Sequence, residues 1–245
     1  MTLKNHVLNI RDFLLDLLFP VFCQNCHKEG EYLCAKCQEK IILNKKSHCP
    51  ECKKANEFGN YCRSCQENFY LKGVWISASY HDQLLKKLIK KYKYSLIKEL
   101  TTPLSQVMID FLSDFLTDES SKKLKILDFR HTVIIPVPLH KRRIAWRGFN
   151  QSEELASLVA QKFSIEHNNH QLIRSKNTSS QTRFDRQTRI KNIGNAFAWN
   201  GPKLEKKYVI LIDDVITTGT TLNECAKILR QNGAKEVWGL VLGQN

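Results

Sequence analysis

The chain lacks a long uninterrupted apolar run. In its N-terminal part, Arg11, Asp12 and Asp16 interrupt the leucines and phenylalanines, so no stretch approaches the roughly 20 residues that a membrane-spanning helix needs. The same charges fall where a secretion signal would have its apolar core. We therefore predict a short amphipathic helix over residues 1–19, no membrane span and a cytoplasmic location.

Acidic residues are also scarce. The 245 residues include 38 Lys and Arg but only 24 Asp and Glu, which gives a formal net charge of +14. Such an excess favours a polyanionic partner: a nucleic acid, an acidic membrane surface or a phosphorylated small molecule. Charge alone does not choose among these three.

Cysteines, in contrast, are abundant and regularly spaced. Eight of the nine form four CxxC pairs, namely Cys23/Cys26, Cys34/Cys37, Cys49/Cys52 and Cys62/Cys65. In a reducing compartment this pattern is typical of metal ligation, with redox dithiols or disulfides as the alternative. Two pairs complete a tetrahedral shell of four thiolates, which suits zinc. We predict two structural Zn²⁺ ions, each shared most simply by consecutive pairs because the closed loops are then shortest; crossed pairing stays open.

A lysine-rich helix is predicted after a strand in residues 73–80. No acid occurs from Gln83 through Lys98. Apolar residues take one face of this helix (Leu84, Leu85, Leu88, Ile89 and Tyr92), and five lysines take the other (Lys86, Lys87, Lys90, Lys91 and Lys93). A lysine face without neutralising acids is suited to bind the phosphates of DNA. The alternative is an ordinary solvated surface.

The remaining pattern alternates between strands and helices. We expect a helix over residues 100–116, a buried strand over 132–138, a helix starting near Asn150, a long surface loop over 167–195, and a final strand, helix and strand over 209–212, 220–231 and 236–242. This order indicates an α/β fold with a parallel sheet. The predicted organisation is a helix (1–19), a double zinc-ribbon module (20–70) and an α/β domain (71–245).

The segment VILIDDVITTGTT is the strongest candidate for a ligand site. Two acids, Asp213 and Asp214, follow an apolar strand, and the small residues Thr217, Thr218, Gly219, Thr220 and Thr221 then lead into a helix. Ligands bind at the carboxyl ends of parallel strands, where backbone amides and hydroxyls can surround a phosphate. The carboxylates would accept hydrogen bonds from sugar hydroxyls, with Mg²⁺ as a bridge. GxxxxGK and GxGxxG motifs are both absent. The segment therefore predicts a ribose 5-phosphate site, against the alternative of an acidic turn with a Thr-rich helix cap.

This segment resembles the phosphoribosyl diphosphate (PRPP) fingerprint of the type I phosphoribosyltransferases. The chain as a whole is similar to the ComF branch of that superfamily, in the ordered motifs LLDLLFPVFCQNC, YHDQLLKKLIKKYKY, IIPVPLHKRRIAWRGFNQS and QTRFDRQTRIKNIGNAF together with the CxxC pairs. The resemblance implies a type I phosphoribosyltransferase-like parallel sheet flanked by helices.

The resemblance also implies roles for individual residues. Asp213 and Asp214 would hold the ribose hydroxyls and act in catalysis, and residues 217–221 would hold the 5-phosphate. The diphosphate loop would include Lys141, Arg142 and Arg143, and the mobile loop would place Gln181, Arg186, Arg189 and Asn192 near the ligand. Arg147, Arg186 and Arg189 are further candidates for DNA contacts, while Trp146 and Phe149 could stack on bases or belong to the core.

Three functions are compatible with these patterns. The family implies a competence protein that handles or imports single-stranded DNA in natural transformation, with a helicase-like partner. The alternatives are an active phosphoribosyltransferase on an unknown acceptor and a PRPP or nucleotide sensor without turnover. The basic balance and the lysine helix favour DNA, and no motif identifies an acceptor base.

Overall fold

The computed structural model describes residues 20–176 and 196–245, so the predicted helix over residues 1–19 lies outside the described residues. Contacts divide the chain into two compact units, Met1–Ile41 and Ile42–Asn245. The smaller unit contains the first two CxxC pairs and the short helix α2 (Ala35–Gln38). The larger unit contains the other two pairs and the whole central sheet.

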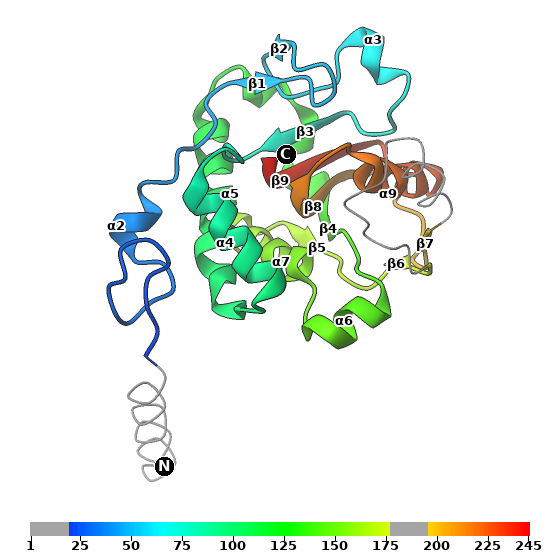
Figure 1. Ribbon diagram of the computed structural model, residues 1–245. Helices are drawn as coiled ribbons and strands as arrows, with labels where there is room; N and C mark the ends of the chain where they lie inside the picture. Colours follow the sequence, from blue (N-terminus) through cyan, green and yellow to red (C-terminus); the bar gives the residue numbers. More distant parts are fainter. Residues whose placement is uncertain (1–19, 177–195) are drawn as a thin grey trace, which may run out of the picture. The chain divides into compact units, whose positions relative to one another are not determined.

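The larger unit is built on a parallel sheet of five strands in the order β3-β9-β8-β4-β5 (Figure 1). The strands are β3 (Gly73–Ile76), β4 (Thr132–Pro136), β5 (Glu166–His167), β8 (Tyr208–Ile216) and β9 (Glu236–Gln244). Each neighbouring pair is parallel. The predicted α/β architecture is therefore confirmed.

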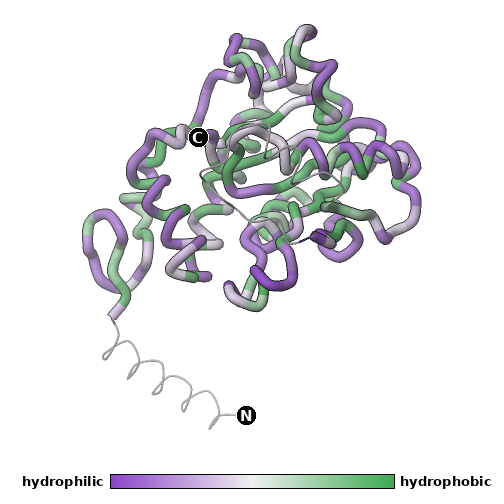
Figure 2. The backbone as a smooth tube through the Cα atoms, turned by 45° about the vertical axis from the view of Figure 1, so that its right-hand side comes forward, coloured by the Kyte–Doolittle hydropathy of each residue, from purple (hydrophilic) through white to green (hydrophobic). Residues whose placement is uncertain are grey.

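Helices cover both faces of this sheet. One face packs against α5 (Thr101–Thr117) and α7 (Gln151–Phe163), with α4 (Gln83–Tyr94) against α5, and the other packs against α9 (Thr220–Gln231). Side chains along the strands alternate between these faces, so Val209 and Leu211 share a core cluster with Leu222 and Leu229 of α9. Figure 2 shows the sheet as the most hydrophobic part of this unit. Four short 3₁₀ helices connect the elements: Lys98–Leu100, Ser121–Lys123, Lys125–Leu127 and Phe129–His131.

Strand β8 extends further than predicted. Its pairing with β4 ends where Ile212 faces Pro136, but its pairing with β9 continues to Ile216 opposite Gln244. The expected end of this strand at Ile212 was wrong. Strand β9 continues beyond its predicted end at Leu242 to Gln244, and its last residues pair with Val215 and Ile216 of β8. Asp213 thus lies beyond the last pair with β4 and pairs with Val241 of β9, and Asp214 follows it.

The expected surface loop over residues 167–195 contains a strand. Residues Leu172–Arg174 form β6, which pairs antiparallel with β7 (Phe197–Trp199). A run of three residues is too short for an apolar period to show, and its partner lies across the undescribed segment. The positions Gln181, Arg186, Arg189 and Asn192, predicted as mobile-loop or DNA contacts, lie outside the described residues.

The second pair of CxxC motifs is built into the larger unit. This ribbon contains β1 (Ser47–His48), β2 (Ala55–Asn56) and α3 (Arg63–Gln66). Trp75 of β3 donates its indole N–H to the carbonyl of Phe58 at 3.0 Å, and Cys49 and Tyr61 belong to the same buried cluster as the α9 face of the sheet. Throughout the described residues, no helix combines the length and the apolar character needed to cross a membrane.

Candidate functional site

The acid pair at the end of β8 is held by three neighbouring elements. An oxygen of Asp213 accepts hydrogen bonds from the Ser152 hydroxyl on α7 and from the backbone N–H of Asp214, both at 2.9 Å. The carboxylate of Asp214 accepts from the backbone N–H of Val215 at 2.6 Å and pairs with Lys93 Nζ at 2.8 Å. Strand β8 and helices α4 and α7 therefore meet at these two carboxylates.

Electrostatics distinguish Asp213 from an ordinary surface acid. Burial and the adjacent charge of Asp214 raise the pKa of Asp213 to about 7, although Lys93 acts in the opposite direction. Burial alone would lower the pKa of Lys93, but the charge and hydrogen bond of Asp214 outweigh it and raise that pKa. At neutral pH the cluster thus has one fixed ion pair and one carboxyl group close to its titration midpoint.

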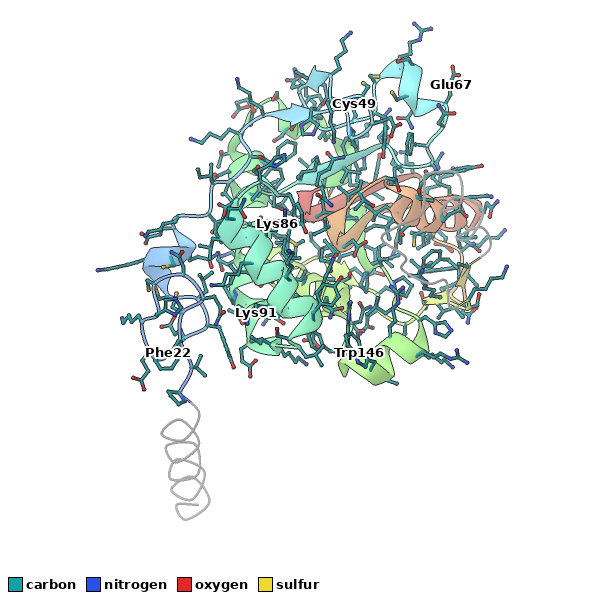
Figure 3. All side chains as sticks on the ribbon, in the orientation of Figure 1. Phe22, Cys49, Glu67, Lys86, Lys91 and Trp146 are labelled. Atoms are coloured by element: carbon teal, nitrogen blue, oxygen red, sulfur yellow. The ribbon has the colours of Figure 1, made fainter. Side chains whose placement is uncertain are left out.

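Lys93 corrects part of the sequence prediction. The lysines of α4 were expected to share one outward face, and Lys87 and Lys90 are indeed exposed. Figure 3 shows Lys86 and Lys91 along this helix. Lys93 instead turns toward Asp214, and its side chain is only 22% exposed. The prediction that Lys93 belongs to the exposed lysine face was wrong.

The predicted phosphate turn follows directly after β8. A cavity of about 80 Å³ is lined by Asp213, Val215, Ile216 and the residues from Thr217 to Leu222. That volume is well below the roughly 300 Å³ of a site for a whole drug-sized ligand. It is therefore suited to a small group, such as a phosphate, rather than to a nucleobase.

Helix α9 presents its N-terminus to this cavity. Gly219 is its N-cap residue, with a φ of +72°, and no side chain among the described residues caps the helix there. The Thr218 and Thr220 hydroxyls bond to each other at 2.8 Å instead. An N-terminus without a side-chain cap keeps backbone donors for an anion, which argues against the alternative of a Thr-rich helix cap.

Tyr61 of the second ribbon lies against this turn. A Cβ atom at Gly219 would be 3.4 Å from the Tyr61 hydroxyl oxygen and 3.4 Å from Cδ1 of Ile216. The Tyr61 ring stacks on Phe69, with 4.0 Å between the ring centroids. Asn223, in the first turn of α9, also accepts from the backbone N–H of Tyr70 at 2.7 Å. The ribbon thus forms a wall beside the phosphate turn.

The predicted diphosphate loop leads into a helix. Residues Lys141–Arg147 form α6, and the His140 side chain caps it by accepting from the backbone N–H of Arg142 at 3.2 Å. Lys141 and Arg142 are exposed, whereas burial and the nearby charge of Arg147 lower the pKa of Arg143. Leu139 and His140 of the predicted loop lie outside regular structure, and residues 141–143 form the first turn of α6 because the His140 cap starts the helix there. A contact of this segment with diphosphate stays a prediction.

Arg174 is a partly buried basic residue whose electrostatic interaction with Asp213 the sequence did not reveal. Burial, followed by the charge of Arg143, lowers the pKa of Arg174, while Asp213 acts in the opposite direction. Strand β6 therefore brings this guanidinium within electrostatic reach of the acid pair. Its only signal in the sequence was one basic residue within a polar segment.

The cysteines form two compact groups of four, Cys23/Cys26/Cys34/Cys37 and Cys49/Cys52/Cys62/Cys65, and within each group the sulfur atoms lie within 4.8 Å of one another. The Sγ atoms of Cys26 and Cys34 are 3.6 Å apart, as are those of Cys52 and Cys62. A tetrahedral ion with Zn–S bonds of about 2.3 Å places its ligands about 3.8 Å apart. Consecutive pairs therefore share a site, and both donor sets fit a structural Zn²⁺.

The thiols of the second group share their protons: hydrogen bonding with Cys62 raises the pKa of Cys65 to about 12. The Ser64 hydroxyl and the side chain of Cys65 lower the pKa of Cys62 to about 6, so this sulfur is available as a thiolate near neutral pH. All nine cysteines are free of disulfides. The ninth, Cys225, is fully buried in the core on α9.

Comparison with known proteins identifies the family. Residues 14–66 match the family model of the double zinc ribbon domain, and residues 150–242 match that of the phosphoribosyl transferase domain. Competence protein F of Haemophilus influenzae is 32% identical over 225 residues, which cover 85% of this chain and 96% of that protein. The chain belongs to the ComF family.

Other ComF relatives match over similar lengths. Competence protein ComFC of Bacillus subtilis is 28% identical over 208 residues, covering 84% of this chain and 81% of its own. DNA utilization protein YhgH of Escherichia coli K12 is 28% identical over 238 residues, covering 91% and 98%. These relatives match this ComF chain over most of its length, which includes both the zinc-ribbon region and the phosphoribosyl transferase region.

Proposed function

We propose that this protein handles single-stranded DNA in natural transformation and binds a sugar phosphate of the PRPP type at the turn between β8 and α9. The names of its relatives, competence protein and DNA utilization protein, support the first part. The arrangement of Asp213 and Asp214 beside the cavity at the N-terminus of α9 carries the second.

The sugar-phosphate proposal assigns a task to each side of the cavity. Backbone donors of residues 217–221 and the N-terminus of α9 receive the 5-phosphate. Asp213, whose oxygen is oriented by Ser152, accepts hydrogen bonds from a ribose hydroxyl, and Asp214 does the same next to Lys93. Arg174 and the basic residues of α6 supply positive charge for a diphosphate group.

Magnesium fits this assignment as a companion of the ligand. Around the cavity the described protein donors are the Asp213 carboxylate, Thr hydroxyls and backbone groups, which is too small a set for an all-protein cage. Asp213 would hold Mg²⁺ together with oxygens of the ligand, and the ion would supply positive charge that neutralises the leaving diphosphate.

Calorimetric titration with PRPP and Mg²⁺ tests the site. Replacing both acids, Asp213→Asn with Asp214→Asn, is expected to abolish measurable binding while two zinc ions per chain are retained. A control with Asp110→Asn and Asp114→Asn removes the same charge from α5 and is expected to bind as the unchanged protein does. Normal PRPP binding by the acid-pair variant would refute the site assignment.

The DNA proposal rests on the lysine face of α4, defined as Lys86, Lys87, Lys90 and Lys91. No acid occurs in the sequence from Gln83 through Lys98, and Lys87 and Lys90 are exposed. Reversing these four lysines to Glu is expected to weaken binding of the 20-residue oligothymidylate dT20. The dependence of affinity on salt should also flatten, by about 0.7 in logarithmic slope for each lost phosphate contact.

A charge-matched control separates this face from net charge. Reversing Lys162, Lys203, Lys206 and Lys235, which are all exposed, changes the charge by the same amount on other elements. Fluorescence anisotropy of labelled dT20 at several salt concentrations measures both variants. Equal loss in the two variants would show that net charge, not the α4 face, attracts the strand.

The same acid pair also supports turnover. Displacement of diphosphate from the anomeric carbon creates positive charge on the sugar, which neighbouring carboxylates stabilise. Release of diphosphate from PRPP in the presence of an acceptor would identify a phosphoribosyltransferase, whereas binding without release would identify a sensor.

A further inference from the structure

Exposed aromatic and aliphatic side chains gather where α4 ends and α6 lies. Tyr94 is 62% exposed, Trp146 59%, Ile144 38% and Leu96 37%. These are four of the seven large exposed apolar residues within the described parts of the chain. Figure 3 shows Trp146 at the α6 side of this surface. Phe149 is different: it is buried and packs on Tyr92, with 5.3 Å between the ring centroids.

Arg147 connects the two exposed rings. Its guanidinium carbon lies 5.8 Å from the ring centroid of Tyr94 and 5.8 Å from that of Trp146. Nη1 donates to Oε1 of Gln151 at 2.7 Å, which fixes the guanidinium, while the buried Nε has no acceptor among the described residues. A planar cation and two aromatic rings are therefore held side by side at the surface.

The charge on α6 and the residues leading into it is of one sign. No acid occurs from Phe129 through Asn150, and Lys141 and Arg142 are exposed on α6. Tyr94 lies seven residues after Lys87 and four after Lys90, so helical geometry places it on the same face, about 10 Å along the axis from Lys87. A row of phosphate-binding lysines thus leads to the rings.

The same elements hold the acid pair. Tyr94 follows Lys93, whose Nζ is 2.8 Å from Asp214. Gln151, which holds Arg147, precedes Ser152, whose hydroxyl donates to Asp213 at 2.9 Å. Residues adjacent in sequence to Tyr94 and to Gln151 therefore contact the acid pair.

We propose that Tyr94, Trp146 and Arg147 form a stacking platform for unpaired bases of single-stranded DNA. This inference rests on the proposed function and assigns the base contacts to specific residues. Aromatic faces and a guanidinium plane stack on any base, and the lysines of α4 hold the backbone. The absence of acids between residues 129 and 150 favours this polyanion over a protein partner, which would pair its own charges across the rim.

Anisotropy titration of dT20 with the full chain tests the platform. Tyr94→Ala with Trp146→Ala is expected to weaken binding roughly 10- to 100-fold, whereas Tyr94→Phe with Trp146→Phe should restore affinity to within about threefold because the ring faces remain. Tyr70→Ala is the matched control, since Tyr70 is an aromatic residue 49% exposed on another part of the unit. Unchanged dT20 affinity in the double alanine variant would overturn the proposal.

Two further measurements separate stacking from other effects. A dA20·dT20 duplex should show no loss of affinity in the double alanine variant, because its bases are paired; an equal loss for the duplex would overturn base stacking. The affinity of the same variant for PRPP, measured by calorimetry, should be unchanged. A loss of dT20 binding with normal PRPP binding would therefore concern the platform alone, and a loss of PRPP binding would concern the sugar-phosphate site. If the unaltered chain does not bind dT20, both the platform and the DNA role are refuted.

Tryptophan emission gives an independent signal. Of the four tryptophans, Trp75 and Trp238 are buried and stacked on each other, with 4.9 Å between the ring centroids, and Trp199 is partly exposed on β7. The measurement therefore uses Trp199→Phe as the background, in which quenching by dT20 should come from Trp146. Trp146→Phe should remove most of the quenching while DNA binding persists. Full quenching in that variant would contradict a base on Trp146.

Discussion

Lys93 and Asp214 join the last turn of α4 to the end of β8 through an ion pair of 2.8 Å. The helix that presents the lysine face thereby also positions the acid pair. If both proposals hold, Tyr94 would contact the DNA strand while its neighbour Lys93 holds Asp214, the carboxylate assigned to the sugar phosphate.

Removal of this lysine charge should destabilise the larger unit. In Lys93→Met, two neighbouring carboxylates are left without their cation, and the free energy of unfolding at pH 8 is expected to fall by about 2 kcal/mol. Urea denaturation measures the change. Lys93→Arg retains the charge and should recover at least half of the loss. Equal stability of the methionine variant would show that the ion pair contributes nothing.

Stability should depend on pH through Asp213. Its pKa is about 7 in the folded protein against an ordinary 3.8, so between about pH 4 and pH 7 the folded state holds a proton that the unfolded chain has released. The contribution of this group to stability is therefore present at low pH, decreases as the pH rises toward 7, and is constant above it. The difference in unfolding free energy between the unaltered chain and Asp213→Asn, measured from pH 5 to pH 8, should follow this curve; a flat difference would contradict it.

The affinity for PRPP should increase with pH, whereas the contribution of Asp213 to stability decreases. The ionised carboxylate accepts hydrogen bonds from ribose hydroxyls, so PRPP affinity is expected to increase from pH 6 to pH 8. Part of that increase comes from ionisation of the ligand phosphates, and Asp213→Asn, if it retains weak binding, shows that part alone. Parallel pH profiles for the two proteins would exclude Asp213 as the responsible group.

The turn at Gly219 should tolerate no side chain. Its φ of +72° is a left-handed conformation, which costs a residue with a Cβ about 1 kcal/mol. Gly219→Ala is therefore expected to lower stability by about that amount and also to weaken PRPP binding. Gly233→Ala is the control, because Gly233 follows the other end of α9 with a φ of +97° and should lose stability without loss of affinity.

The two cysteine clusters should differ in what their loss affects. Cys49→Ser and Cys26→Ser are each expected to remove one zinc ion per chain, as measured by metal analysis. Cys49 lies in the core of the larger unit, so its replacement should lower the melting temperature of that unit by about 10 °C and weaken PRPP binding. Cys26 belongs to the smaller unit, and its replacement should leave PRPP affinity intact.

Elements with long, regular patterns could be predicted from the sequence. Helix α9 spans the expected residues 220–231, Asn150 caps α7 through Ser152, and the strand beginning at Thr132 is buried throughout. In each case one local property, such as apolar spacing or a capping residue, determines the element. The spacing of the CxxC pairs likewise predicted two sites with four thiolates each.

Features that depend on distant partners could not be predicted in the same way. Strand β6 exists because β7 pairs with it, and the role of Arg174 follows from that pairing. Lys93 lies only about 40° around the helix from the buried Ile89, so it stands at the border of the apolar face. The position of Asp214, far along the chain, decides that this lysine turns inward.

The burial of Tyr61 and Cys49 also determines where the chain can be shortened. Cutting at the predicted boundary near residue 70 would leave Leu71 and Val74, both buried beside these residues, facing water. A fragment beginning near Ile42 keeps that apolar surface covered. It is therefore the shorter form to express when the larger unit is to be crystallised or labelled for spectroscopy without the first cysteine cluster.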